Sequence, residues 1–391
     1  LPLAVSASPS RLVEVEMMIW QLLVRAAFTL LFILAMGAGQ AEELGAIGDS
    51  ISTAMNADDV CDDAVECVEN MGEDWDRSFV TGDQSWSVRS RLLPFGFLGA
   101  RTAAYNGAEW EDALPQAQEL MAVPGVSLVV IELGGNDVCQ RLGEPLPSLD
   151  AVETHIDQTL TYLTDTLPSG GYVVMAEVPD VLRLREIMRF QPHFLFESCQ
   201  ALWDLDYDAL SDAAVMDVCE DLYGDWLCDN VSEFRDLTED WLADLLEWLS
   251  EDVFGDQFPC ANVLNSASTE ETREAATEFN RQINDLLARK AREYTDRNGV
   301  SVLLAGGVYD HPYAVDEVSG LDCFHPSRSG QAYLANLIWP TIYDAFTEPD
   351  CSADGYCNPD CRRGADPDCK KGKGQGKAQK STPPVVQQAP E

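Results

Sequence analysis

Four short apolar runs recur along the chain, and glycine or proline follows each of them. They cover residues 44–47, 128–133, 172–178 and 300–305. Runs of this length that include β-branched residues and end at turn residues are typical of strands buried on both faces. We therefore expect these runs to be strands of one covered sheet.

Helical periodicity occupies the stretches between these runs. Apolar residues recur at intervals of three and four over residues 149–167, 270–294 and 330–339. Alternating strands and helices indicate an α/β fold with a mainly parallel sheet. We place the domain that contains these strands and helices at residues 42–346.

An acidic segment interrupts the alternation. Residues 203–258 contain 18 Asp and Glu against one basic residue, Arg235, and tryptophans and leucines are interleaved with the acids. This pattern predicts amphipathic helices, which we assign to an acidic, Trp-rich helical insertion within residues 180–268. Two interpretations stay open: a solvated surface insertion, or a cap over a substrate cleft.

The C-terminal sequence changes character twice. Residues 347–369 hold four cysteines and predict a small cross-linked module, whereas residues 370–391, rich in Lys and Gly with a net charge of +4, predict a disordered tail. The four thiolates could bind zinc and the neighbouring aspartates calcium, but the spacings of zinc knuckles and of the EF-hand loop are absent. We expect disulfides in the module and no metal or other cofactor.

Composition limits the partners of the chain. With 67 Asp and Glu against 25 Lys and Arg, the 391 residues carry a formal charge of −42, which repels phosphate backbones and excludes a nucleic-acid-binding function for the body. A hydrophobic content of 46% indicates that the acidic body is folded. We expect a monomer in which the basic tail or the cysteine module attaches to a surface.

The N-terminal segment predicts export. Residues 1–41 comprise an upstream stretch and a signal peptide, in which Arg25 precedes 13 uncharged residues and small residues precede the expected cleavage after Ala41. A membrane anchor is the competing interpretation, but the uncharged run is shorter than the ~20 residues of a spanning helix. The expected location is therefore secreted or periplasmic.

Twelve cysteines, eight of them within residues 42–346, agree with an oxidising compartment. We predict that most of the eight form disulfides, with a connectivity that the sequence leaves open.

A serine follows the first predicted strand. Gly48, Asp49 and Ser50 come directly after residues 44–47, where α/β sheets present reactive groups. The competing interpretation is a serine that caps a helix over residues 53–71. The choice depends on partners for the hydroxyl.

A serine nucleophile needs a base, and the chain has four histidines. His325 follows Asp322 by three residues, a spacing that allows the carboxylate to accept from Nδ1 and leave Nε2 free as the base. His311 has an acid directly adjacent, which is less well placed. His155 and His193 lie in helical and aromatic surroundings, where a structural role is expected.

Acyl transfer also needs donors for an oxyanion. Asn136 follows the strand over residues 128–133 and can offer its side-chain amide at the same sheet edge as Ser50. Gly107 offers a backbone N–H that a substrate can approach closely. Each of the two also has an ordinary explanation as a turn residue.

Taken in order, these segments resemble the SGNH (GDSL-type) hydrolase family, whose marks are a Gly-Asp-Ser block, a glycine, a Gly-x-Asn block and Asp-x-x-His. Three further segments resemble the phospholipase B-like branch. These are Trp75 with Ser78-Phe79-Val80-Thr81-Gly82, Phe279-Asn280-Arg281-Gln282-Ile283-Asn284, and Asp322-Cys323-Phe324-His325-Pro326-Ser327. The sequence departs from the family where Ala108 and Glu109 follow Gly107, since many members have Asp-Thr there.

The resemblance implies a three-layer α/β/α flavodoxin-like fold and a secreted serine esterase or lipase that acts through an acyl-enzyme. It implies that Ser50 is the nucleophile, His325 the base and Asp322 its orienting acid. The implied oxyanion donors are the backbone N–H groups of Ser50 and Gly107 and the side-chain Nδ2 of Asn136. The expected substrate is an acyl ester or lipid, including phospholipids and lysophospholipids. Two alternatives stay open: a carbohydrate acetylesterase, and a secreted binding or adhesion protein that uses the fold as a scaffold.

Overall fold

The computed structural model describes residues 42–58, 60, 70–194, 196–204 and 260–347. The predicted N-terminal segment, the bulk of the acidic insertion, and the cysteine module and tail lie outside these residues. The chain divides into two units, Leu1–Ile342 and Tyr343–Glu391. Of the second unit, the structure describes residues 343–347, where the last helix ends.

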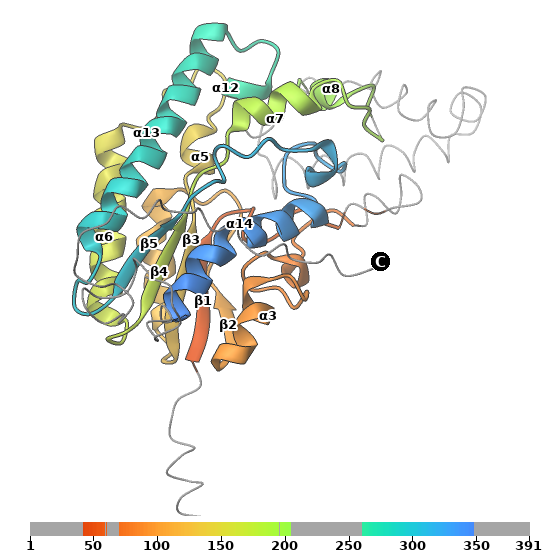
Figure 1. The fold of residues 1–391 in the computed structure, drawn as a ribbon. Coiled ribbons are helices and arrows are strands. Elements are labelled where there is room, and N and C mark those ends of the chain that lie inside the picture. Colours follow the sequence, from red (N-terminus) through yellow and green to blue (C-terminus); the bar gives the residue numbers. More distant parts are fainter. Residues whose placement is uncertain (1–41, 59, 61–69, 195, 205–259, 348–391) are drawn as a thin grey trace, which may run out of the picture. The chain divides into compact units, whose positions relative to one another are not determined.

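Within the described residues, five parallel strands form one sheet in the order β2-β1-β3-β4-β5 (Figure 1). The four predicted strands are confirmed, and β2 is a fifth that the apolar pattern did not predict. Their bounds are β1 Glu42–Gly48, β2 Phe97–Thr102, β3 Val126–Glu132, β4 Tyr172–Ala176 and β5 Ser301–Ala305.

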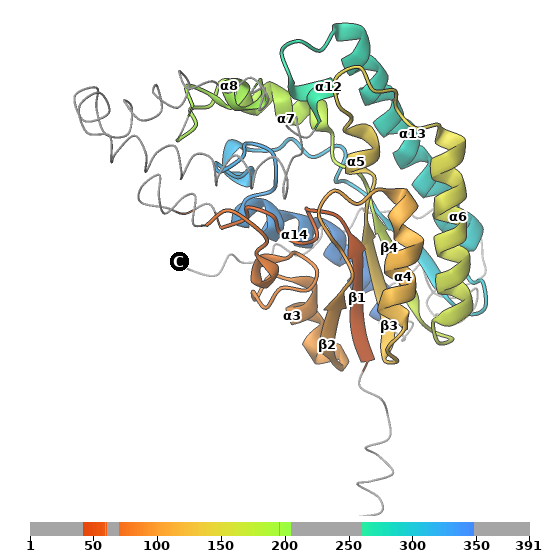
Figure 2. The ribbon, with the colours of Figure 1, turned by 180° about the vertical axis from the view of Figure 1, so that it is seen from behind.

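Helices cover both faces of this sheet, which confirms the three-layer α/β/α architecture. Helices α4, α6 and α13 lie on one face, and α3 and α14 lie on the other, as the opposite views of Figures 1 and 2 show. The three expected helices correspond to α6, α13 and α14. The bounds of the five are α3 Val88–Leu92, α4 Ala113–Met121, α6 Leu149–Thr166, α13 Glu270–Tyr294 and α14 Arg328–Phe346.

Short helices lie in the connections between the strands and the long helices. The α-helical ones are α5 Gly135–Val138, α7 Val181–Met188, α8 Cys199–Trp203 and α12 Ala261–Leu264. The 3-10 helices are Trp75–Arg77, Leu93–Phe95, Trp110–Asp112 and Val315–Glu317. Within the described ranges, no helix has both the length and the apolar character needed to cross a membrane.

The strand order creates a switch point between β1 and β3. From β1 the chain moves to one side to form β2, then returns past β1 to form β3 on the other side. The connections that leave the carboxyl ends of β1 and β3 therefore run over opposite faces, and such a divergence leaves a crevice for ligands. Ser50 follows β1 and Asn136 follows β3, so the fold brings these two predicted residues to that crevice.

Two disulfides confirm the predicted pairing for four of the eight body cysteines. They join Cys139 to Cys260 and Cys199 to Cys323. The other body cysteines, residues 61, 67, 219 and 228, and the four of the C-terminal module lie outside the described residues.

The competing expectation for Ser50, a helix over residues 53–71, is wrong where the structure describes that stretch. Residues 50–56 form turns, and the backbone of Ala54 and Asn56 is left-handed, with φ of 57° and 55°. A right-handed helix excludes such angles. Ser50 therefore lies in a turn and does not cap a helix.

Candidate active site

The turn after β1 exposes Ser50 to a pocket while its backbone is held from several sides. The Asp49 carboxylate accepts from Ile51 N at 2.9 Å, and the carbonyl of Ser50 accepts from Thr53 Oγ1 at 3.1 Å and from Met55 N at 3.0 Å. Gly48 leaves no room for a side chain, because a Cβ there would lie 2.9 Å from the carbonyl oxygen of Glu132. These contacts explain the Gly-Asp-Ser order at this position.

A second segment supports the same turn from behind. Ser78 Oγ donates to the carbonyl of Ser52 at 2.8 Å, and Gln331 Nε2 donates to the carbonyl of Ile51 at 2.9 Å. The Gln331 side chain also accepts from Phe79 N at 2.9 Å. The Ser78-Phe79 motif noted in the sequence thus holds the Ser50 turn in place, directly through Ser78 and through Gln331, which Phe79 contacts.

Asp322 and His325 form a buried dyad within one loop. His325 Nδ1 lies 2.6 Å from Asp322 Oδ2, and Asp322 Oδ1 accepts from the backbone N–H groups of Phe324 at 2.9 Å and His325 at 3.0 Å. Asn56 Nδ2 also donates to Oδ2. With Asp322 an acceptor, Nδ1 carries the proton and Nε2 is unprotonated in the neutral ring.

Electrostatics keep the Asp322 carboxyl ionised. Its burial, which leaves 1% exposed, raises the pKa, but the adjacent His325 and the donated hydrogen bonds outweigh this effect and hold the pKa of Asp322 below its ordinary value. An ionised carboxylate at Nδ1 is the arrangement that orients an imidazole as a base.

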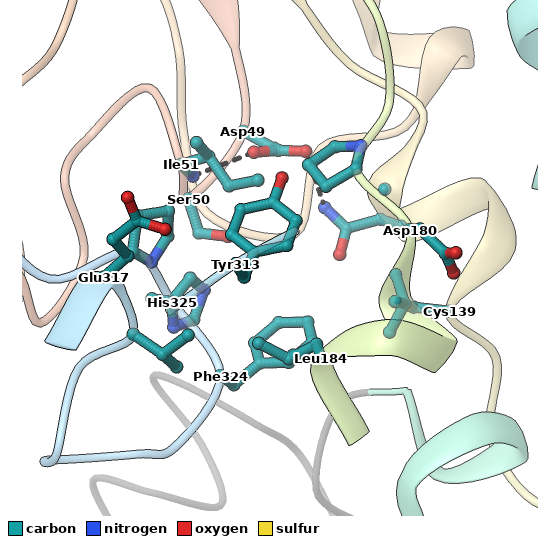
Figure 3. Close-up of a pocket in the computed structure, with 16 residues that line it drawn as sticks. Asp49, Ser50, Ile51, Cys139, Asp180, Leu184, Tyr313, Glu317, Phe324 and His325 are labelled. Atoms are coloured by element: carbon teal, nitrogen blue, oxygen red, sulfur yellow. Dashed lines mark hydrogen bonds between the residues drawn. The ribbon is translucent and has the colours of Figure 1, made fainter. Parts of the chain in front are cut away.

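Ser50 and His325 line the same pocket, as Figure 3 shows. Within the described residues, no hydrogen bond joins the Ser50 hydroxyl to the His325 ring. Catalytic hydrogen bonds of this kind are often long until substrate binds. The structure therefore brings the predicted nucleophile and base to one cavity without yet linking them.

Asn136 lies in the same pocket lining, at the start of α5. Its Nδ2 donates to the carbonyl of Ala108 at 2.9 Å and, at 3.5 Å, to Asp49 Oδ2. Gly107 has a left-handed backbone, with φ of 76°, but it is exposed and does not belong to this lining. Of the predicted donors, the structure places the residues Ser50 and Asn136 at the pocket, and Gly107 outside it.

The remaining histidines do not line the pocket. His193 Nε2 lies 2.9 Å from the carbonyl oxygen of Leu321, and His311 Nε2 lies 2.7 Å from Glu317 Oε2 while its ring stacks on Tyr333. Both are buried. His155 lies within α6. The place of His155 and the contacts of His193 agree with the structural roles expected for these two, and His311 is paired with an acid other than the adjacent Asp310.

A buried acid pair beneath Ser50 was missed by the sequence analysis. Burial raises the pKa of Asp49 to about 6, and burial together with the Asp49 charge raises the pKa of Glu132 well above its ordinary value. Glu132 Oε2 accepts from Ser52 Oγ at 3.3 Å. The sequence did carry one signal for this pair, because Glu132 is the single acid within the apolar run over residues 128–133.

Apolar side chains form the far wall of the pocket. The residues involved come from α7 and from the segment that carries the dyad, together with a disulfide-bonded cysteine; Figure 3 labels Leu184, Phe324 and Cys139 among them. They are Val181, Leu184, Val318, Phe324 and Cys139. None of the described residues in the lining is Lys or Arg.

The loop before α7 is fixed by α13. Asn284 Oδ1 accepts from Val178 N at 2.8 Å, its Nδ2 donates to the carbonyl of Val178 at 3.1 Å, and Asn280 Nδ2 donates to the carbonyl of Pro179 at 2.6 Å. The Asn280 to Asn284 motif noted in the sequence therefore positions the segment that leads into the apolar wall.

Within the described ranges, no group of three or more His, Cys, Asp and Glu could hold a metal ion.

Comparisons with known proteins found solved structures of low sequence identity. Among solved structures, the chain is similar to TesA, with 16% identity, 78% of this chain and 99% of that chain covered, and a TM-score of 0.33. It is similar to an extracellular lipase from Streptomyces rimosus, with 17% identity, coverage of 78% and 100%, and a TM-score of 0.30. A carbohydrate esterase shares 10% identity, with coverage of 79% and 71% and a TM-score of 0.36.

No curated protein matches the chain significantly. The profile of the GDSL-like Lipase/Acylhydrolase family, by contrast, matches residues 44–338, which is well over half of the sequence. This span contains the Ser50 turn, the Asn136 segment and the Asp322–His325 loop. The chain therefore belongs to the GDSL-like lipase/acylhydrolase family.

Proposed function

We propose that this protein is a serine ester hydrolase in which Ser50, His325 and Asp322 form the catalytic triad. The observation that carries the proposal is the Asp322–His325 dyad, joined at 2.6 Å, facing the same pocket as Ser50. A serine hydroxyl that shares a pocket with an oriented imidazole is suited to attack on a carbonyl carbon once substrate brings the two together.

The reaction runs in two halves. His325 Nε2 takes the proton of Ser50 as the hydroxyl oxygen attacks the ester carbonyl carbon, and then gives that proton to the departing alcohol. Water, deprotonated by the same nitrogen, next attacks the acyl-enzyme and releases the carboxylic acid and Ser50. Asp322 stays ionised throughout and stabilises the imidazolium.

The oxyanion that forms in each half needs N–H donors. We assign this role to the backbone N–H of Ser50 and to Asn136 Nδ2. Asn136 Nδ2 donates to the carbonyl of Ala108 and to Asp49 Oδ2, and its contact with Asp49 is long, at 3.5 Å. An N–H of Asn136 that gives up this long contact can donate to the oxyanion instead, where the developing charge strengthens the hydrogen bond.

The apolar wall supports an acyl ester as the substrate. Leu184, Val181 and Phe324 can bury the methylene groups of an acyl chain beside Ser50, and each buried methylene contributes about 0.8 kcal/mol. Lipid esters, including phospholipids and lysophospholipids, belong to this class. The N-terminal signal segment supports export to an extracellular or periplasmic location.

A substrate panel tests the proposal. The purified protein is assayed on short- and long-chain acyl esters, glycerophospholipids and acetylated sugars, together with Ser50→Ala and with Ser169→Ala as a matched control on an exposed serine. We expect hydrolysis of acyl esters, a loss of at least about 10³-fold in Ser50→Ala, and an unchanged rate in Ser169→Ala. Preference for acetylated sugars would favour a carbohydrate acetylesterase, and inactivity of the folded wild type on every ester would favour a binding protein.

A further inference from the structure

Both disulfides of the described chain end on a loop of the site. Cys323 lies between Asp322 and His325, and its partner Cys199 begins α8. Cys139 follows Asn136 by three residues, and its partner Cys260 precedes α12. Each bridge thus joins a loop that carries a site residue to a segment more than 100 residues away, with sequence separations of 124 and 121.

The backbone at Cys323 is unusual for its residue type. Its φ is 58°, in the left-handed region that non-glycine residues rarely adopt. The hydrogen bonds of the dyad depend on this turn, because Asp322 Oδ1 accepts from the N–H groups of Phe324 and His325, which follow Cys323. A right-handed Cys323 would redirect both N–H groups and separate the carboxylate from the imidazole.

The turn has further supports on its outer side. Cys323 N donates to the carbonyl of Ser319 at 2.9 Å, and Ser319 N donates to the carbonyl of His325 at 2.8 Å. The Cys323 side chain is 1% exposed, so its bond to Cys199 acts from within the protein core. This bond fixes the side chain of the residue in the dyad loop whose backbone is left-handed.

The other bridge lies at a junction that has its own hydrogen bonds. Gln140 N donates to Asn262 Oδ1 at 3.0 Å, Asn262 N donates to the carbonyl of Gln140 at 3.0 Å, and Asn262 Nδ2 donates to the carbonyl of Val138 at 2.9 Å. Cys139, which lines the pocket, has an ordinary φ of −89°. The left-handed residue of this bridge is Cys260, with φ of 64°, and it is not part of the pocket lining. This junction therefore keeps its connections to α12 when the sulfur bond is absent.

We propose that the Cys199–Cys323 disulfide is a positioning element of the active site, which holds the left-handed turn that aligns Asp322 with His325. The inference rests on the proposed function of the triad. If the bond has this role, the rate of the chemical step depends strongly on Cys199–Cys323. The same rate depends much less on Cys139–Cys260.

Two double variants test the difference. We expect Cys199→Ala/Cys323→Ala to lower kcat about 10- to 100-fold, as misplaced catalytic groups do, at a temperature where circular dichroism shows the fold intact. Cys139→Ala/Cys260→Ala should lower kcat several-fold less and should mainly raise KM, because Cys139 lines the pocket. A disulfide that only stabilises the fold would lower Tm and leave kcat unchanged in both.

A third variant separates backbone conformation from loss of the bond. Cys199→Ala/Cys323→Gly also lacks the bridge, but glycine adopts a positive φ without steric cost. We expect it to recover kcat by about five-fold or more over Cys199→Ala/Cys323→Ala. Equal kcat in the two variants would overturn the role assigned to the left-handed turn, even if both are slower than the wild type.

Graded reduction of the wild type covers the case in which the variants do not fold. A dithiol breaks one S–S bond, delivers two electrons and two protons to give two thiols, and is itself oxidised to a disulfide. Peptide mapping should show kcat falling with the opening of Cys199–Cys323. Unchanged kcat with that bond open would overturn the inference alone, whereas an inactive oxidised wild type would overturn the proposed function.

Discussion

At the scale of single residues, hydrogen bonds fix the position of the Asp322 carboxylate in the candidate site. Within the described chain it accepts from Asn56 Nδ2, from two backbone N–H groups and from His325 Nδ1. Carboxylates with several donors stay ionised even when they are buried. The direction of the imidazole, and with it the direction of Nε2 in the pocket, follows from this arrangement.

Asn136 offers the clearest residue-scale prediction for catalysis. Asn136→Ala removes the side-chain donor and should lower kcat about 10²- to 10³-fold with little change in KM, because the lost hydrogen bond forms to the transition state. Steady-state kinetics on a soluble acyl ester measure this split. A fall in kcat/KM carried by KM alone would instead assign Asn136 to ground-state binding.

Asp137 predicts a pH dependence of stability. Burial raises the pKa of this carboxyl to about 7 in the folded state from 3.8, and Trp110 N donates to it at 3.1 Å. The folded state therefore retains a proton that the unfolded state has released, so the free energy of unfolding falls as pH rises from about 4 to 7. Asp137→Asn should reduce this fall by about 1–3 kcal/mol.

Urea unfolding at several pH values measures that change, with Asp83→Asn on an exposed carboxyl as the control. A pH slope in Asp137→Asn equal to that of the wild type would show that Asp137 is already ionised in the folded state.

The sequence pointed to the proposed catalytic residues more clearly than to the residues around them. Ser50 and His325 are conspicuous because a serine follows a buried strand and one histidine has an acid three residues before it. Glu132, which pairs with Asp49, and Tyr313, which lines the pocket (Figure 3), were not predicted as parts of the site. Their relation to it depends on tertiary packing between distant segments. Gly107 was expected at the pocket, but the turn after β2 leaves it exposed outside the lining.

At the scale of elements, burial decides which strands can be predicted. The central strands β1, β3 and β4 are apolar on both faces and stand out in the sequence. Strand β2 lies at the sheet edge with an exposed Leu98, and it includes Gly99 and Arg101, so its pattern is neither continuous nor alternating. Turns with left-handed residues, such as the one after β1, likewise give no periodic signal.

Helix α7 predicts how the acyl chain is selected. Leu184 belongs to the pocket lining, so Leu184→Trp should fill part of the wall and shift the preferred acyl chain toward fewer carbons, with about 10-fold or greater loss on the longest esters that the wild type hydrolyses. Glu186→Ala changes an exposed residue of the same helix and should leave the chain-length profile unchanged. Equal profiles in all three proteins would remove α7 from the acyl site.

At the scale of the whole molecule, charge is the dominant property. The chain carries −42 although residues 370–391 contribute +4, so the acidity is concentrated in the preceding sequence. Self-repulsion among these acids destabilises the compact state, and salt screens it. The charge can be read directly from the composition, whereas the strand order that forms the crevice could be seen only in the structure.

Salt should therefore stabilise the protein. We expect the free energy of unfolding to rise by about 1 kcal/mol or more between roughly 10 mM and 0.5 M salt, with sodium and potassium chloride acting alike because screening depends on ionic strength. Denaturation by urea at each ionic strength measures the effect. A constant or falling free energy would show that acidic repulsion does not limit stability.

Covalent labelling of Ser50 tests the central claim most directly. A fluorophosphonate reacts with a serine only when a neighbouring base activates it. We predict one adduct per folded wild-type chain, located at Ser50 by peptide mapping, and greatly slowed labelling in His325→Ala. An active, folded wild type that stays unlabelled, or that is labelled at another serine, would contradict the account.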